Sequence, residues 1–202
     1  MTLQALECPQ CGAPATPAVR TCTYCRAPIF FERLSDVGAV AEGSRLKFQA
    51  HFERLLAGDP SNGQAALALG LHYLDLKAFR EAQPHFTRAK ELLPLRGEVR
   101  YYEALNLVRG RALRSLSLSE IRSLEELLQT ASRMDEANGL YDIFLGVLKH
   151  EYYWANGLRV PAPGATELVR QGLDKAPDPS ELDRLLQLLP IRDDGLYDQI
   201  AG

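Results

Sequence analysis

Long apolar runs and excess positive charge are both missing from this chain of 202 residues. No apolar run approaches the ~18 residues that a membrane span requires. Lysine and arginine total 23 against 26 acidic residues, and this balance argues against general nucleic-acid binding. Met1–Glu7 has neither the basic nor the apolar region of a secretory signal. We therefore expect a cytoplasmic protein without a membrane segment, for which nucleic acid is a disfavoured partner.

The common catalytic motifs are missing as well. No phosphate-binding G-x-x-x-x-G-K-[ST] loop, dinucleotide G-x-G-x-x-G fingerprint or G-x-S-x-G elbow occurs. His150-Glu151 begins like the zinc-protease motif H-E-x-x-H, but Trp154 stands where the second histidine belongs. The other histidines are scattered through the chain: His51, His72 and His85. We therefore expect that the protein is not an enzyme.

Cysteine is scarce and confined to one place. All four cysteines occur in two C-x-x-C pairs, Cys8 with Cys11 and Cys22 with Cys25. Four thiolates brought together suit one tetrahedral metal ion, and Zn²⁺ favours such a closed set of four sulfur ligands. A closed set leaves no coordination position for a substrate. The sequence therefore predicts one structural zinc ion and no catalytic metal.

C-x-x-C pairs have other uses, namely disulfides and redox dithiols. Disulfides are disfavoured here because no export signal precedes Cys8. Oxidation of zinc thiolates would release the metal, so a zinc-thiolate redox sensor is one alternative function. A nucleic-acid-associated factor that uses the cysteine segment is another. The few charges of Met1–Arg33 weaken this second alternative, since three arginines stand there against two glutamates.

The first 33 residues resemble a small bacterial zinc ribbon of the C-P-x-C-G type. Gly12 follows the first pair as in that motif, whereas Arg26 takes the equivalent place after the second. The resemblance implies a domain, residues 1–33, whose folding free energy comes mostly from the metal. The apolar residues that follow are expected to pack the ribbon onto itself or onto the first helix: Ile29, Phe30 and Phe31.

An internal repeat is the second strong signal. Residues 63–94 carry, in order, Leu69-Gly70, Tyr73, Ala82, Phe86, Ala89 and Pro94. These residue types at these intervals resemble the tetratricopeptide repeat (TPR), L-G-x-x-Y followed by A-x-x-x-F-x-x-A and a closing proline. Small Gly70 and Ala82 would let two antiparallel helices approach closely.

Weaker helical patterns surround this repeat. Helices are expected over about 31–40, 44–57, 98–113, 117–134, 138–154, 165–175 and 178–189. Ser117 and Glu120 have the spacing of a capping box. The predicted fold is mainly α, a TPR-like α-α superhelix of three to four helical hairpins over residues 34–189, preceded by the small four-cysteine zinc ribbon. Residues 190–202 form an acidic C-terminal tail.

The resemblance to TPR arrays implies a protein-binding groove lined by the first helix of each repeat. The corresponding positions of the clear repeat are Gln64, Leu67, Leu71, Leu74 and Asp75. Leucines at these places favour an apolar helix or an extended segment as the partner, and not a charged C-terminal peptide. Ordinary core packing is the alternative for the three leucines.

Two aromatic clusters are further candidate contacts. They are Tyr101-Tyr102 and Tyr152-Tyr153-Trp154. Adjacent aromatic residues on a helix cannot all face one core, so one of each cluster is expected to be exposed or at an interface. The candidate partner contacts are completed by Tyr101, Tyr102, Arg109, Tyr153 and Trp154. Taken together, the residues favour a non-enzymatic adaptor or scaffold that binds protein partners.

Overall fold

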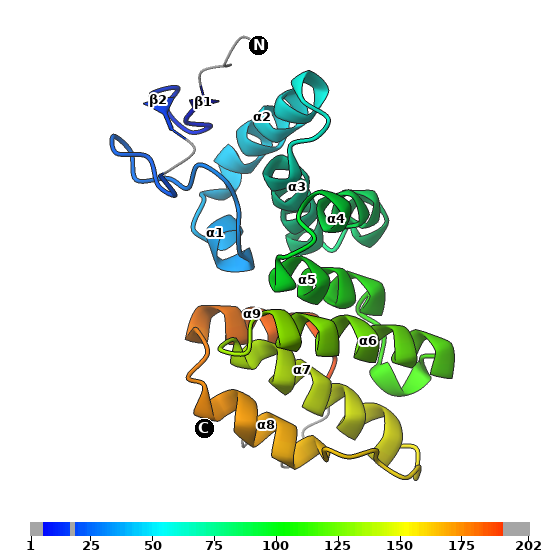
Figure 1. The fold of residues 1–202 in the computed structure, drawn as a ribbon. Helices are drawn as coiled ribbons and strands as arrows, with labels where there is room; N and C mark the ends of the chain where they lie inside the picture. Colours follow the sequence, from blue (N-terminus) through cyan, green and yellow to red (C-terminus); the bar gives the residue numbers. More distant parts are fainter. Residues whose placement is uncertain (1–5, 17–18, 192–202) are drawn as a thin grey trace. The chain divides into compact units, whose positions relative to one another are not determined.

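The computed structural model describes residues 6–16 and 19–191, and these residues are mainly helical. They form nine α-helices and one small antiparallel sheet, in which β1 (Leu6–Glu7) pairs with β2 (Pro14–Ala15) (Figure 1). The cysteine segment precedes the helices, so the predicted mainly α fold is confirmed. The chain divides into two compact units, residues 1–93 and 94–202.

The first unit contains the small sheet and four helices. The helices are α1 (Leu34–Gly38), α2 (Arg45–Gly58), α3 (Gly63–Asp75) and α4 (Phe79–Leu92). Helices α3 and α4 form a closely packed hairpin, and both α1 and α2 pack against α3. Asn62 caps α3 by accepting a hydrogen bond from Ala65 N at 2.9 Å. Gly70 lies directly against the ring of Phe86, as the repeat pattern predicts.

The second unit contains five helices. They are α5 (Gly97–Val108), α6 (Leu118–Met134), α7 (Gly139–Lys149), α8 (Ala165–Asp174) and α9 (Pro179–Leu188). Helices α5 and α6 form one hairpin, α7 and α8 form another, and α6 packs against α7. A π-helical turn, His150–Trp154, extends α7. Consecutive α8 and α9 do not form a hairpin of this kind, because α9 packs against α7.

Most helix boundaries lie within about one residue of those that the sequence predicts, with or without a side-chain cap. Ser117 and Glu120 form the predicted capping box at the start of α6, with Ser117 N donating to Glu120 Oε2 at 2.8 Å. Helix α5 is shorter than predicted, because Arg109 adopts a left-handed conformation with φ of 55°. The first helix is also shorter than expected, since α1 covers only Leu34–Gly38 of the predicted 31–40.

Three further expectations concern membrane spans, the acidic tail and the domain boundaries. No helix in the parts of the chain that the structure describes combines the length and apolarity needed to cross a bilayer. Residues 192–202 of the predicted acidic tail lie outside the described residues. The predicted domain of 34–189 spans both compact units, whose boundary falls between Leu93 and Pro94.

Candidate metal centre

The two C-x-x-C pairs fold into matched turns. In the first, Cys8 N donates to Ala13 O at 2.8 Å and Gly12 N donates to Cys8 O at 2.9 Å. In the second, Cys22 N donates to Ala27 O at 2.8 Å and Arg26 N donates to Cys22 O at 2.9 Å. The same backbone pattern therefore presents two sulfur atoms from each turn.

Gly12 and Arg26 occupy equivalent places in these turns. Their φ angles are 73° and 61°, so both residues lie in the left-handed region. Glycine adopts this conformation freely, whereas a residue with a Cβ is disfavoured there by about 1–2 kcal/mol. The departure of Arg26 from the C-P-x-C-G pattern therefore leaves the turn geometry unchanged and costs the second turn some stability.

The four cysteine sulfur atoms are grouped around one common centre. Cys8 Sγ lies 3.5 Å from Cys25 Sγ, and Cys11 Sγ lies 3.7 Å from Cys22 Sγ. All four lie within 4.8 Å of one another. With metal–sulfur bonds of about 2.3 Å, a tetrahedral ion requires sulfur–sulfur separations of about 3.8 Å. Sulfur atoms in a disulfide would be only about 2.05 Å apart. The four cysteines are thus free thiols positioned to bind one metal ion.

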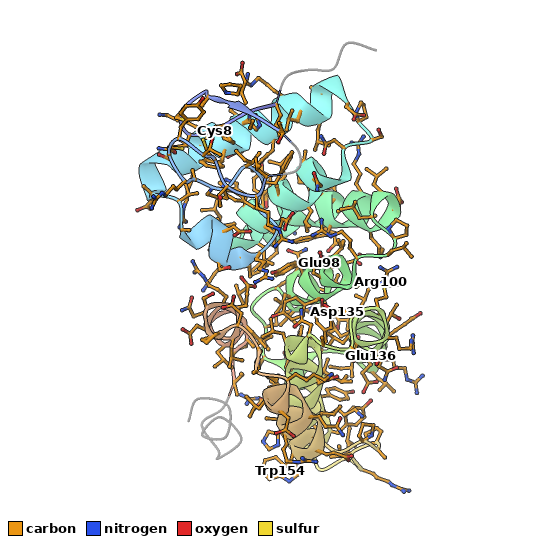
Figure 2. All side chains as sticks on the ribbon, turned by 60° about the vertical axis from the view of Figure 1, so that its left-hand side comes forward. Cys8, Glu98, Arg100, Asp135, Glu136 and Trp154 are labelled. Atoms are coloured by element: carbon orange, nitrogen blue, oxygen red, sulfur yellow. The ribbon has the colours of Figure 1, made fainter. Side chains whose placement is uncertain are left out.

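The four cysteines differ in exposure and acidity. Cys8 (labelled in Figure 2) and Cys22, the first of each pair, are buried, whereas Cys11 and Cys25 are exposed. Hydrogen bonds from the backbone of Cys25 and Tyr24 lower the pKa of the Cys22 thiol to about 6. Burial raises the pKa of Cys8 to about 12. Since metals bind thiolates, loading of this site must release protons.

A small apolar cluster supports the metal ligands. Ile29 is fully buried and packs with Cys8 and Cys22. The next two residues reach helix α2: the Phe31 ring stacks on Phe48 at 5.0 Å between centroids, and Phe30, which also packs against the cysteine cluster, stacks on Phe52 at 5.9 Å. Packing within the cysteine segment is therefore present as predicted, whereas the helix that receives the phenylalanines is α2 and not the first helix.

The predicted groove residues of α3 lie mostly in the core. Leu67, Leu71 and Leu74 are at most 1% exposed, as expected if they pack between helices of this unit. Gln64 and Asp75 are partly exposed, and Asp75 accepts a hydrogen bond from Arg45 Nη1 at 2.8 Å. Core packing is the alternative that the sequence left open for the leucines. A partner contact by this helix stays a prediction.

Neither Tyr101 nor Tyr102 is exposed, so of the two outcomes expected for this pair exposure is wrong and an interface contact stays a prediction. Both are 2% exposed, because α5 is covered on two sides. The Tyr101 ring contacts Tyr141 of α7 at 5.4 Å between centroids, and Tyr102 donates a hydrogen bond to Glu181 of α9 at 2.8 Å. Arg109 is exposed at the end of α5.

The second aromatic cluster does present one exposed ring. Trp154 (labelled in Figure 2) is 56% exposed and stacks on His150, with 4.5 Å between the ring centroids. Tyr153 is partly buried and donates a hydrogen bond to Glu125 Oε2 at 3.3 Å. Tyr152 is buried. This arrangement is the one expected from three consecutive aromatic residues on a helix.

The sequence patterns did not reveal the buried polar side chains of the second unit. Lys149 is 2% exposed, and its Nζ donates to Pro161 O at 3.1 Å and Pro163 O at 2.9 Å. Glu181 on α9 is also 2% exposed. The hydrogen-bond partners of Lys149 and Glu181 lie 12 or more positions away in the sequence, so no local sequence pattern indicates these contacts.

No protein-family model, curated protein or solved structure matches the chain. The assignment of the metal centre therefore depends on the sulfur geometry and on the chemistry of four thiol donors. The packing of the helices is the remaining basis for a functional proposal.

Proposed function

We propose that this protein is a non-enzymatic adaptor that binds protein partners through a TPR-like helical surface. A structural zinc ribbon forms a cap or a second contact site. The observation that carries this proposal is the series of hairpins α3/α4, α5/α6 and α7/α8, which follows a cluster of four cysteines. Repeated hairpins provide extended surfaces for other chains, and this is their usual role in proteins.

The packing inside the hairpins supports a TPR-like repeat. A Cβ at Gly70 of α3 would meet the Phe86 ring of α4, and a Cβ at Gly146 of α7 would lie 2.8 Å from Val169 Cγ2 of α8. In both hairpins, then, a glycine that follows a leucine lets the second helix approach. The shared spacing favours repeats of one kind over unrelated helices.

Zinc is the ion that the four sulfur ligands favour. A set of four thiolates with no carboxylate or imidazole suits zinc, and filling all four positions leaves none for a substrate. The first test is the metal content of the protein purified without added metal. We expect one zinc ion per chain in the wild type and none in a Cys11→Ser variant. Iron or an empty site in the wild type would refute the zinc assignment.

The adaptor proposal is tested by identifying the proteins that co-purify with this chain from its native cells. Tagged protein would be purified with and without nuclease, and the co-purifying chains would be identified by mass spectrometry. We expect stoichiometric protein partners that survive nuclease. Partners that vanish with nuclease would support the nucleic-acid alternative. The ion pair between Arg20 Nε and Glu32, 3.4 Å apart, weakens that alternative, because it neutralises one of the arginines near the cysteines.

A redox sensor is favoured by one observation, the exposure of Cys11 and Cys25. Exposed zinc thiolates are open to peroxide, and their oxidation to disulfides would release the ion. Mild peroxide followed by thiol titration and zinc release would test this function. Retention of zinc and of four titratable thiols would eliminate it.

A further inference from the structure

Helix α9 departs from the hairpin series. It packs against α7 instead of α8, and its Glu181 accepts a hydrogen bond from Tyr102 of α5 across 79 positions of sequence. Figure 2 shows α9 on one side of α5 and α6 on the other. The last described helix therefore covers a face of α5 and α7 that the hairpin partners leave open.

Contact is made through a narrow stripe of α9. Glu181 and Leu185 are 2% and 0% exposed and, being four residues apart, share one face of the helix. Leu189, 3% exposed, follows four positions later as the residue with extended backbone that ends α9. Asp183 and Gln187, on other faces, are exposed. One carboxylate and two leucines thus hold α9 in place.

The buried side of α5 that α9 reaches carries polar groups. Tyr102, which donates to Glu181, is 2% exposed, and Asn106, one helical turn later on the same side of α5, is fully buried. Asparagine is rare in permanent cores, whereas reversible protein interfaces combine aromatic and polar side chains. The composition of this face is therefore that of a docking surface.

Helix α9 also has features that favour reversible undocking from α5 and α7. Its ten residues are too few to form a stable helix alone, so its helical form depends on docking. The connection from α8 passes through Ala176, with φ of 48°, and Pro177. Neither residue continues the preceding helix. Segments with few buried contacts open at low free-energy cost compared with the core.

We propose that the face of α5 and α7 beneath α9 is the partner-binding surface, and that α9 occupies it within the free chain. The partner is an amphipathic helix with a glutamate followed by leucines four and eight positions later, the pattern of Glu181, Leu185 and Leu189. This inference rests on the proposed adaptor function and names its partner class. Binding of the partner requires release of α9, which lowers the apparent affinity by the fraction of open chain.

The test uses the full chain and a fluorescein-labelled peptide of residues 177–191. The Leu185→Asp/Leu189→Asp double variant should release α9, because two charges cannot stay buried in the stripe. We expect this variant to bind the peptide at least about tenfold more tightly than the wild type does. The matched control is Gln187→Asp, which adds a charge on an exposed face and should bind like the wild type. A peptide carrying Leu185→Asp should not bind either protein.

Circular dichroism and thermal unfolding decide whether the double variant keeps its fold. A folded double variant with no gain in peptide affinity would overturn the proposal. If the double variant does not fold, Tyr102→Phe is decisive, since it removes one hydrogen bond to Glu181 and keeps the ring. It should speed amide exchange in α9 about threefold or more, leaving α7 unchanged. Uniform exchange in α9 and α7 would show that α9 is permanent core.

Failure of the adaptor function would look different. In that case the peptide would bind the released variant as expected. Purification from native cells would nevertheless yield no stoichiometric protein partner with either the wild type or the released variant. The peptide measurement thus tests whether the face beneath α9 binds a helix, and the purification tests whether the protein binds partners in cells.

Discussion

Gly70 faces Phe86 across the α3/α4 hairpin at a distance that excludes any side chain on the glycine. A Cβ built there would lie 2.7 Å from Cε1 and 2.8 Å from Cδ1 of the ring. Carbon atoms in contact normally stay about 3.5–4.0 Å apart. Phe86 is fully buried, so its ring has little room to retreat.

Gly70→Ala is therefore expected to destabilise the protein. Alanine favours a helix over glycine by ~1 kcal/mol, but overpacking against the ring costs about 1–3 kcal/mol. Urea unfolding should show a net loss of stability. Gly43→Ala is the control, because nothing lies within 4 Å of its Cβ position. Equal stability of both variants would contradict the close approach of α3 and α4.

Gly139→Ala should be more damaging than Gly70→Ala. Its Cβ would collide with the backbone carbonyl of Gly172 on α8, and a backbone cannot turn aside as a ring can. We expect a loss above the ~3 kcal/mol of ordinary overpacking. Thermal unfolding gives the comparison, with Gly164→Ala as the control because its surroundings are open. A loss smaller than that of Gly70→Ala would count against this geometry.

Removal of the metal should unfold the cysteine segment and leave the helices that follow it. A strong chelator is expected to expose Arg20 and Arg26 to trypsin, because the small apolar cluster around Ile29 cannot hold the turns alone. The helical circular dichroism signal should change little. Thr23→Ser, an exposed position between two ligands, serves as the control and should keep its metal. Trypsin resistance after chelation would show that the segment folds without metal.

The capping box of α6 should make stability depend on pH. Backbone and side-chain hydrogen bonds from Ser117, with Arg111, lower the pKa of Glu120 to about 2. An unfolded glutamate has a pKa of about 4.3, so the charged form stabilises the fold above this value. The contribution is lost as the pH falls from about 5 towards 2.

Glu120→Gln isolates this charge. It should cost about 0.5–1 kcal/mol at pH 7, a modest value because the side chain is 41% exposed. The difference from the wild type should shrink as the pH falls towards 2 and vanish below the folded pKa, in urea unfolding measured across pH. Glu126→Gln, exposed on the same helix, provides the comparison. A difference that persists at low pH would mean that the glutamate acts through its shape and not its charge.

Lys149 should fix the loop that joins α7 to α8. Its Nζ donates to the carbonyl groups of Pro161 and Pro163, and burial lowers the pKa of the ammonium group. Lys149→Met should destabilise the protein by about 1–3 kcal/mol and open the loop to trypsin at Arg159. Lys77→Met, at an exposed position, should change neither quantity. Unaltered cleavage at Arg159 in Lys149→Met would contradict this role.

Features set by neighbouring residues were predictable from the sequence. The capping box of Ser117 and Glu120 and the cap of α9 at Asp178 involve residues two or three positions apart. The cysteine cluster was predictable too, because C-x-x-C spacing alone brings two sulfur atoms to one turn. For these features, local chemistry determines the structure without help from the rest of the chain.

Features set by distant contacts were not predictable. Tyr102 is buried because α9 returns to it, and no pattern near Tyr102 indicates this contact. The sequence predicted a helix over about 178–189, but not which helices it would cover. The early end of α5 at Arg109 likewise has no signal in the arginine itself.

The junction between the cysteine segment and the helices contains no spacer. Ile29 belongs to the small cluster around the metal ligands, and Phe30 and Phe31 already pack on α2. A single residue inserted after Ile29 would move both rings out of register with Phe48 and Phe52. The two parts therefore cannot be exchanged or lengthened independently, so a transplanted cysteine segment must include Phe30 and Phe31 together with the face of α2 that receives them.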